Sequence, residues 1–177
     1  DGECLTALVL QPQLAATDSA FALWCHGDSA IVTWGDACSG GDKVQDQLRG
    51  VQQIQATHYA FAAILEDGSV VTWGVPHSGS CSSAVQDQLK GVQKIQAANY
   101  AFAAILGDGS VVTWGNPDYG GDSSAVGDQL KGVLQIQATK GAFAAILEDE
   151  SIVTWGIALG GGDSSAVQDQ LRGVQQI

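Results

Sequence analysis

One fifteen-residue phrase occurs three times in this chain, almost letter for letter. AFAAILEDGSVVTWG at 60–74 returns as AFAAILGDGSVVTWG at 101–115 and as AFAAILEDESIVTWG at 142–156. A catalytic site normally needs different residues brought together once, whereas a stacking unit needs the same shape made repeatedly. The repetition therefore predicts a repeat architecture, and function must be sought where the copies differ.

The spacing of the copies sets the size of the repeat. Trp73, Trp114 and Trp155 are each 41 residues apart, and a basic residue keeps the same step at Arg49, Lys90, Lys131 and Arg172. This register brings in a degenerate earlier copy, AFALWCHGDSAIVTWG at 20–35, as is common for a terminal repeat. We therefore expect a single repeat domain with approximate copies at 13–53, 54–94, 95–135 and 136–177.

Each copy contains three segments with strand character. In the second copy these are 50–57, 59–65 and 69–74, and the middle one is apolar on both faces, which predicts a sheet enclosed between two others. Asp67-Gly68 predicts a tight antiparallel hairpin. The fourth copy has Asp149-Glu150 instead, and the Glu Cβ predicts a strained or differently shaped turn.

The remaining segment of each copy supports two interpretations. Ser83-x-x-Gln86 before Gly91 is typical of a capped helical turn, whereas Val85 and Leu89 flank Asp87 with the alternation of a strand. We expect an outer, irregular return segment, with a short fourth strand as the alternative.

Three or four short antiparallel strands at a period near 40 residues are typical of a propeller blade. The predicted fold class is all-β: a β-propeller-like array of four antiparallel blades of about 41 residues, forming an open or partial ring. The core D-G-x-V-x-x-W-G, present at 67–74 and 108–115, resembles the regulator-of-chromosome-condensation repeat family, especially the short form found in bacterial beta-lactamase inhibitory protein II. The resemblance covers 13–177, but Tyr59-Ala60 and its counterparts replace the family's usual Gly and His.

Members of that family generally close with seven blades, so the resemblance implies that four copies are too few for its ring. The chain either closes as a four-bladed ring, with 174–177 pairing near 14–17, or forms an open arc whose ends contact another chain. We expect the open arc, because the terminal copies are the least regular and the sequence stops within a strand pattern. The absence of Met predicts a processed product or a fragment of a longer array.

The net charge and the hydropathy of the chain limit the classes of partner that it can bind. Nineteen acidic and seven basic residues give a formal net charge of -12, which repels phosphate backbones and anionic lipid heads. The longest apolar run, at 59–65, is too short to span a bilayer. We expect no nucleic-acid partner and no membrane insertion, and a soluble or peripheral protein whose compartment the sequence does not fix.

The copies differ mainly in two short segments. One precedes the second strand, at 18–19, 58–59, 99–100 and 140–141, and the other follows Trp-Gly, at 36–42, 75–81, 116–122 and 157–163. The strand directions place both segments on one face, opposite the uniform Asp-Gly turns, which is typical of recognition loops. The competing interpretation is that loops simply tolerate change. The residues that we expect to bind a protein partner are His58, Tyr59, Pro76, His77, Asn99, Tyr100, Asn116, Pro117, Asp118, Tyr119, Lys140, Ile157 and Leu159.

No segment carries a recognisable catalytic, cofactor or metal motif. The three His residues lack a Ser or Cys at a motif spacing, and the GGDS runs at 120–123 and 161–164 lack the carboxylate pattern of calcium loops. Cys4, Cys25, Cys38 and Cys81 have no zinc-site spacing, and both disulfides and free thiols remain open. We expect no enzyme activity, no cofactor and no metal, and we interpret the repeated Trp residues as packing groups between blades.

The sequence therefore favours a non-catalytic protein–protein interaction module. The alternative is a structural extrinsic subunit of a large assembly; phrases such as SSAVQDQLKGVQKIQA at 82–97 resemble uniform repeat proteins of photosynthetic algae, which implies a plastid photosystem complex. The family resemblance implies a third option, a guanine-nucleotide exchange or ubiquitin-ligase-associated propeller. The acidity opposes chromatin association, and we expect no catalytic ligase domain.

Overall fold

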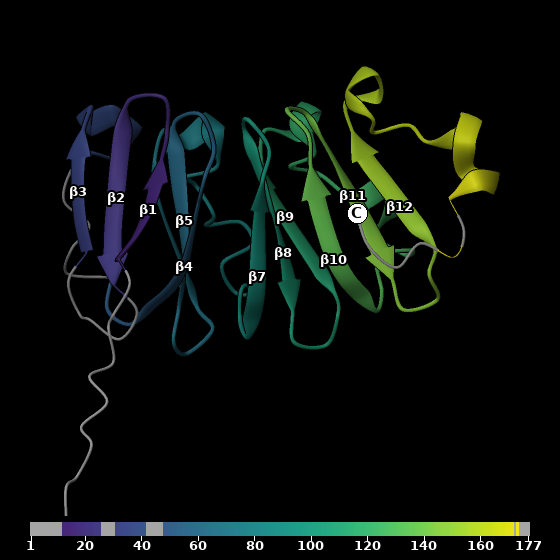
Figure 1. Cartoon of the computed structure of the whole chain (residues 1–177), viewed down its shortest axis with the longest axis horizontal. Helices are drawn as coiled ribbons and strands as arrows, with labels where there is room; N and C mark the ends of the chain where they lie inside the picture. The colour runs from purple at the N-terminus through teal and green to yellow at the C-terminus, as the bar shows by residue number, and fades with distance from the viewer. Residues whose placement is uncertain (1–11, 26–30, 42–47, 172, 174–177) are drawn as a thin grey trace, which may run out of the picture.

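The computed structural model describes residues 12–25, 31–41, 48–171 and 173. Within them the chain forms four three-stranded antiparallel sheets, which we call blades 1 to 4 (Figure 1). The blades are, in order, β1 (Pro12–Ala16), β2 (Ala20–Cys25) and β3 (Ile31–Gly35); β4 (Val51–Ala56), β5 (Ala60–Leu65) and β6 (Val70–Gly74); β7 (Val92–Ala97), β8 (Ala101–Leu106) and β9 (Val111–Gly115); and β10 (Val133–Ala138), β11 (Ala142–Leu147) and β12 (Ile152–Gly156). The predicted all-β array of repeated blades is confirmed.

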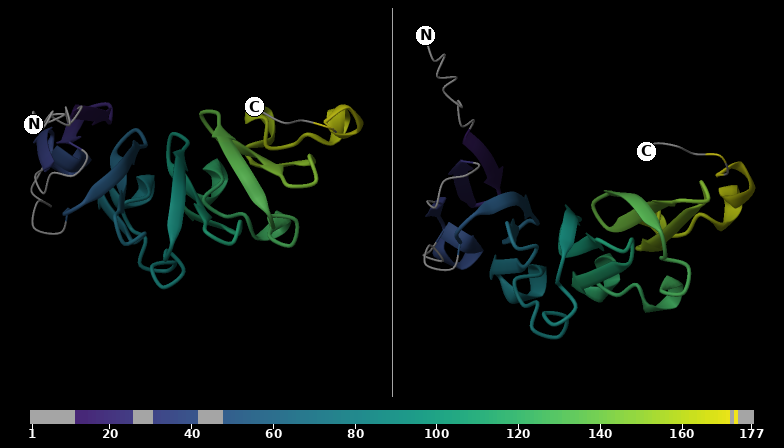
Figure 2. Two further views of the ribbon diagram at one scale, coloured as in Figure 1. Left: turned by 60° about the horizontal axis from the view of Figure 1, so that its bottom comes forward. Right: turned by 90° about the horizontal axis from the view of Figure 1, so that it is seen from below.

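The blades stand side by side along an open arc (Figure 2). The first strands β1, β4, β7 and β10 of neighbouring blades lie against one another, so they form the inner edge of the arc. Blades 1 and 4 are at opposite ends and do not pair through any described strand, so the four-bladed ring is not formed by the described residues. Residues 174–177, which the ring alternative required, lie outside the described part of the chain.

Short helical turns connect the blades. One follows each third strand: η1 (Ala37–Gly41), η3 (Pro76–Ser78), η4 (Pro117–Tyr119) and η6 (Ala158–Gly160), and two more, η5 (Ser124–Val126) and η7 (Ser165–Gln170), lie in return segments. The described return segments contain turns and no strand, so the fourth-strand alternative is wrong.

A side-chain bridge explains why the return segment turns. Ser82 Oγ donates to Gln86 Oε1 at 2.7 Å, and Gln86 Nε2 donates to the Val70 carbonyl at 3.0 Å, which fastens the segment to the third strand. Ser164 and Gln168 repeat the bridge in blade 4 at 2.8 Å. The helical-turn interpretation was therefore correct, but the serine that makes the contact is Ser82 and not Ser83.

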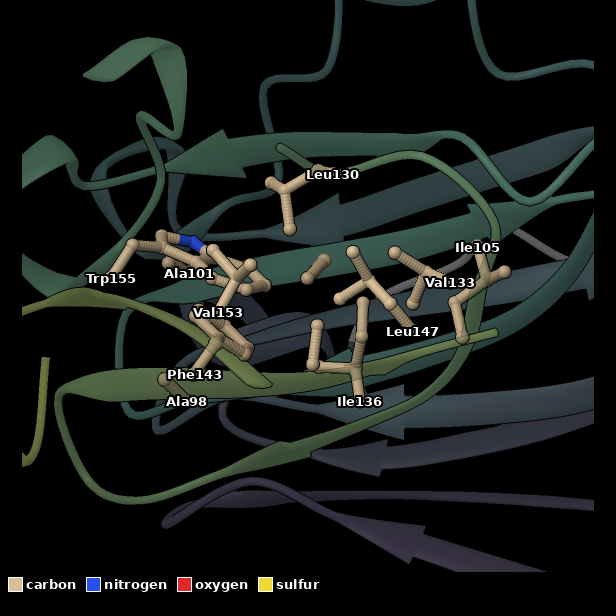
Figure 3. Close-up of a cluster of buried hydrophobic side chains, with 12 residues drawn as sticks. Ala98, Ala101, Ile105, Leu130, Val133, Ile136, Phe143, Leu147, Val153 and Trp155 are labelled. Carbon is tan, nitrogen blue, oxygen red and sulfur yellow. The ribbon is translucent and has the colours of Figure 1, made fainter. Parts of the chain in front are cut away.

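Neighbouring blades pack through opposite faces of their middle strands. In β5, Ala60, Ala62 and Ile64 face blade 3, while Phe61 and Ala63 face blade 1, as the two-residue period of a strand requires. The alanine side chains of one blade thus pack against the large aromatic side chains of the next blade, as Ala60 and Ala62 pack in one cluster with Phe102. Figure 3 shows the junction between blades 3 and 4, where residues of both blades form one buried cluster.

Each of blades 2, 3 and 4 carries a stacked Phe–Trp pair on the face toward its predecessor. Phe61 and Trp73 are cross-strand partners whose ring centroids lie 5.0 Å apart, and both side chains are buried. The Trp73 Nε1 group donates to the Gly40 carbonyl of the preceding blade at 3.1 Å. Trp114 and Trp155 make the same bond to Gly79 and Gly120 at 2.9 and 3.1 Å, which confirms that these Trp residues are packing groups.

The Asp-Gly turns between the second and third strands lie at the edge that we call the lower face. Gly68 and Gly109 adopt φ values of +75° and +77°, and their carbonyls accept from the Val92 and Val133 N–H groups of the next blade at 3.0 and 2.9 Å. Glu150, the counterpart in blade 4, takes φ +61° and keeps the same hairpin bond, to the Leu147 carbonyl at 3.0 Å. The turn is strained, as predicted, but its hairpin bonding is unchanged.

Candidate protein-interaction face

The two variable segments of each copy are joined directly by backbone hydrogen bonds. The residue after each Trp-Gly donates to the carbonyl of the residue before the second strand, as Val75 does to Tyr59 at 2.8 Å and Asn116 does to Tyr100 at 2.9 Å. Asp36 and Ile157 repeat the bond in blades 1 and 4. Both segments therefore lie on the same edge of the array, opposite the Asp-Gly turns, and we call this edge the upper face.

A ladder of backbone hydrogen bonds runs along the upper face from blade to blade. The Asp18 N–H donates to the His58 carbonyl at 2.9 Å, His58 to Asn99 at 2.9 Å, and Asn99 to Lys140 at 3.0 Å. Because only main-chain atoms make these bonds, the side chain at each position is free to differ. One acidic, one imidazole, one amide and one basic side chain follow one another along the arc.

Four aromatic side chains gather over blades 2 and 3. Tyr100 lies at the centre, with its ring centroid 4.6 Å from Tyr119, 5.3 Å from His58 and 6.3 Å from Tyr59. Burial raises the pKa of the Tyr100 hydroxyl, and the neighbouring Tyr59, Tyr119 and Asp18 raise it further. The structure thus brings together four of the predicted contact residues as one half-buried cluster, which we call the aromatic cluster.

His58 also connects the aromatic cluster to blade 1. Its Nδ1 lies 2.6 Å from Asp18 Oδ2, and both side chains are partly exposed. Beside this pair, a shallow hollow of about 410 Å³ runs along the ends of the inner strands, with Asp18, His58, Asn99 and Lys140 at its rim. Asp18 was not among the predicted contact residues, although it occupies the same variable position as His58 in its copy.

The loops after Trp-Gly are held by short helical turns and by side-chain hydrogen bonds. Pro76 and Pro117 each begin a short helical turn, and the Asn116 side chain accepts from the Asp118 N–H at 3.0 Å. Thr57 Oγ1 donates to the Ser78 carbonyl at 2.9 Å, which ties this loop to the inner strand. His77 and Asp118 are therefore exposed on ordered turns.

Blade 4 has a different set of side chains on its part of the upper face. The Ile157 side chain lies over Gly141, and a Cβ at position 141 would approach Ile157 Cδ1 to 2.6 Å. Ile157 thus fills the space above a glycine, where the other copies carry Ser19, Tyr59 and Tyr100. Leu159 is fully exposed, and Lys140 is also exposed, so this end of the face is apolar and basic instead of aromatic.

The lower face differs in chemistry as well as in sequence. Asp67 accepts from both the hydroxyl and the N–H of Ser69, at 2.6 and 2.9 Å, and the Ser110 and Ser151 pairs repeat this with Asp108 and Asp149. These bonds, led by that from the serine hydroxyl, lower the pKa of each carboxyl. The aspartates therefore serve the geometry of the turns.

The described residues can be searched for metal ligands, disulfides and membrane-spanning helices. Among them no group of three or more His, Cys, Asp and Glu side chains could hold a metal ion. Cys25, Cys38 and Cys81 are free thiols, so no disulfide joins these three, and Cys4 lies outside the described residues. No helix in the described ranges is long and apolar enough to cross a membrane.

Comparisons with known proteins place this architecture among solved structures only. No family model and no curated protein matches the chain. The crystal structure of Prp20p from Saccharomyces cerevisiae is similar over 86% of this chain and 47% of its own, with a TM-score of 0.60 and 16% identity. The crystal structure of Kap60 bound to yeast RCC1 (Prp20) is similar over 88% of this chain and 46% of its own, with a TM-score of 0.64 and 16% identity.

A plant protein shows the same likeness. The CRINKLY WD40 ectodomain of the Arabidopsis thaliana receptor kinase ACR4 matches over 87% of this chain and 53% of its own, with a TM-score of 0.56 and 21% identity. This chain spans about half the length of each of these three structures. At such low identity the likeness establishes an RCC1-like repeat fold and leaves the function to be argued from the upper face.

Proposed function

We propose that this chain is a non-catalytic protein-interaction module that binds a protein partner through its upper face. The observation that carries the proposal is the aromatic cluster of His58, Tyr59, Tyr100 and Tyr119 on an otherwise repetitive scaffold. Tyrosine side chains give large contact area for little lost conformational freedom, and they are enriched among residues that dominate binding energy.

The placement of the cluster supports the same conclusion. It lies on turns held by the inter-blade ladder and by the Thr57 bond, so a partner meets a largely preformed surface. Polar groups adjoin the cluster: Asp18 pairs with His58, the Asn99 carbonyl accepts from the His58 N–H, and the exposed Asp118 precedes Tyr119 in the chain. An apolar centre with a polar rim is the usual arrangement of a protein interface. Prp20p, which shares the fold, was studied for its binding to Gsp1p and histones, so a protein partner agrees with the use of this fold elsewhere.

The proposal predicts a contact that depends on one face of the molecule. A photo-reactive amino acid placed at Tyr59 or His77 in the cells of origin should cross-link one protein strongly. The same group at Ser69 or Ser110, on the lower face of the same blades, is the matched control and should not. Equal cross-linking from the upper and lower faces would contradict the proposal. Cross-linking that is undiminished in a Tyr100→Ser variant would contradict it as well.

A second role is favoured by a separate observation, the exposed apolar end of blade 1. Phe21, Val32 and Trp34 are exposed there, as expected for a structural subunit covered by neighbours in a larger assembly. A plastid photosystem complex is one candidate for that assembly. Co-purification of the chain with such complexes is the measurement that supports this role, and recovery of the chain only outside the plastid opposes it.

A further inference from the structure

The return segments of blades 2 and 4 are each fastened to their third strand by one glutamine. In blade 4, Ser164 Oγ donates to Gln168 Oε1 at 2.8 Å, and Gln168 Nε2 donates to the Ile152 carbonyl at 3.1 Å. Ser82 and Gln86 make the same bridge in blade 2. A single side-chain carboxamide thus accepts from a hydroxyl and donates to a strand carbonyl at the same time.

Blade 3 carries a glycine at this position. Its Ser123 and Val111 are the counterparts of Ser164 and Ile152, but Gly127 stands where the glutamine would be. Gly127 has the helical φ of −55°, and a Cβ built on it would lie 3.6 Å from the nearest carbonyl oxygen. The position therefore has room for a side chain, and its backbone conformation does not require glycine.

The strand geometry of blade 3 turns the Val111 carbonyl outward. The Leu106 N–H donates to the Ser110 carbonyl at 2.9 Å. The next pair, Ile105 with Val111, is therefore a non-hydrogen-bonded pair of the antiparallel ladder, and the Val111 carbonyl points away from β8. Val111 is half-buried, whereas Val70, at the same position of blade 2, is only 2% exposed. The outer edge of blade 3 is thus less covered at this point.

The Ser123 hydroxyl is placed for the same contact as its counterparts. Thr113 Oγ1 donates to Ser123 Oγ at 3.1 Å, as Thr154 Oγ1 donates to Ser164 Oγ at 2.9 Å. Since the Ser123 oxygen accepts this bond, its own proton is available for a further bond, as that of Ser164 is in blade 4. The Val126 N–H donates to the Ser123 carbonyl at 3.0 Å, so the turn keeps its shape without the glutamine bridge.

We call the Val111 carbonyl, the Ser123 hydroxyl and the open space at Gly127 the blade 3 notch. It offers one acceptor and one donor to a group that enters from outside. A primary carboxamide matches both, because its oxygen accepts and its nitrogen donates on the same side of the group. A backbone peptide group does not match, since its N–H and C=O point in opposite directions across a trans bond. A carboxylate lacks the donor.

We propose that the blade 3 notch binds the side-chain carboxamide of a glutamine or asparagine from a protein partner. This occupant is favoured because the chain itself shows twice, with Gln86 and Gln168, which group satisfies the same two atoms. Blade 3 has a blade on each side, so the notch is not part of an uncovered end of the array. A hollow of about 560 Å³, lined in part by Ser123 and Val126, adjoins the notch and has room for residues that flank the carboxamide.

The test uses short random peptides displayed on phage as the probe. One carboxamide alone binds weakly in water, and a displayed peptide adds contacts from its flanking residues. Gly127→Gln should fill the notch from within the chain and exclude an external carboxamide. Peptides that bind the unaltered chain are therefore selected, and those that also bind the Gly127→Gln variant are removed. The remaining peptides should share a glutamine or asparagine at one position.

Fluorescence polarisation with one such peptide gives the size of the effect. Binding should weaken at least about tenfold to the Gly127→Gln variant, and equally when the peptide glutamine is replaced by glutamate, which cannot donate to the Val111 carbonyl. Ser123→Ala should weaken binding about threefold to tenfold. Gly107→Gln, the same substitution at an exposed position in the lower turn of blade 3, is the matched control and should bind like the unaltered chain. Circular dichroism checks that each variant is folded.

A selection that leaves no peptide specific for the open notch would overturn the proposal. Equal binding of the glutamine and glutamate peptides would also overturn it, because the contact would not then depend on the carboxamide. The same holds if Gly107→Gln weakens binding as much as Gly127→Gln does. None of these measurements involves the aromatic cluster, so their outcome is independent of the function proposed for the upper face.

Discussion

The upper and lower faces of this molecule join the same blades by the same kind of bond, yet the upper face varies in sequence at every copy whereas Asp67-Gly68 and Asp108-Gly109 of the lower face are identical. On the upper face the His58 N–H donates to the Asn99 carbonyl at 2.9 Å, and on the lower face the Val92 N–H donates to the Gly68 carbonyl at 3.0 Å. A Cβ on Gly68 would lie 2.9 Å from the Gly91 Cα, so the lower junction admits no side chain. The upper junction holds Asp, His, Asn and Lys side chains, so evolution could change that face without opening the array.

The largest expected effect is a loss of stability when a side chain is added at the close contact between blades on the lower face. Gly109→Ala should lower the free energy of unfolding by about 2–4 kcal/mol, because φ is +77° and the new Cβ would lie 2.9 Å from the Gly132 Cα. Asn99→Ala on the upper face of the same blade is the control and should change it by less than about 0.5 kcal/mol. Thermal or chemical denaturation measures both, and equal effects would remove the proposed difference between the faces.

The next effect concerns partner binding. Tyr100→Ala removes the centre of the aromatic cluster and should weaken partner affinity by about 2 kcal/mol, or roughly 30-fold, with a smaller change in stability. Calorimetry or biolayer interferometry with the cross-linked partner measures the change. Asp108→Asn on the lower face should leave affinity unaltered. If the lower-face variant weakened binding as much as Tyr100→Ala, the interaction would not belong to the upper face.

A smaller effect on stability is expected at the turn of blade 4, where Glu150 stands in place of the glycine of the other lower-face turns. Glu150→Gly should raise the free energy of unfolding by about 1 kcal/mol, because glycine adopts the observed φ of +61° without the cost of a Cβ. Denaturant midpoints of the variant and the unaltered chain give the difference. Destabilisation by this substitution would contradict the strain assigned to the φ of Glu150.

The smallest expected effect is a change in the pKa of an aspartate on the lower face. The Ser110 hydroxyl, followed by its N–H, holds the pKa of Asp108 below the ordinary 3.8, so the ionised carboxyl stabilises the turn above that pH and this contribution is lost as pH falls through the lowered value. Ser110→Ala should raise the pKa of Asp108 toward its ordinary range. Carboxyl NMR shifts follow the titration, with Asp67 as an internal reference that should not move.

The repeat carried most of the fold information. The apolar middle strand, the Asp-Gly turns and the 41-residue step led to three correct strands per blade, because each depends on local pattern. The return segment stayed ambiguous, since its shape is decided by the Gln86 bond to the Val70 carbonyl, which joins residues 16 apart. Sequence spacing gives no direct signal for such a bond.

The candidate site was predictable in position but not in composition. Comparing the copies located both variable segments, whereas the clustering of Tyr119 with Tyr100 and the pairing of His58 with Asp18 come from different blades or loops. The packing of Ile157 over Gly141, which leaves Ile157 half-buried, also joins two loops of the chain. The exposure of Trp34 could not be inferred from its repeat position, because that position is buried in the other three blades.

Amide hydrogen–deuterium exchange, with and without the cross-linked partner, tests the central claim most directly. The account predicts that partner binding slows exchange in the upper turns around 57–59, 98–100 and 116–120, where the aromatic cluster lies. The lower turns at 66–69 and 107–110 should exchange at unchanged rates. Protection confined to the lower turns, or spread evenly over both faces, would contradict the assignment of the upper face as the binding surface.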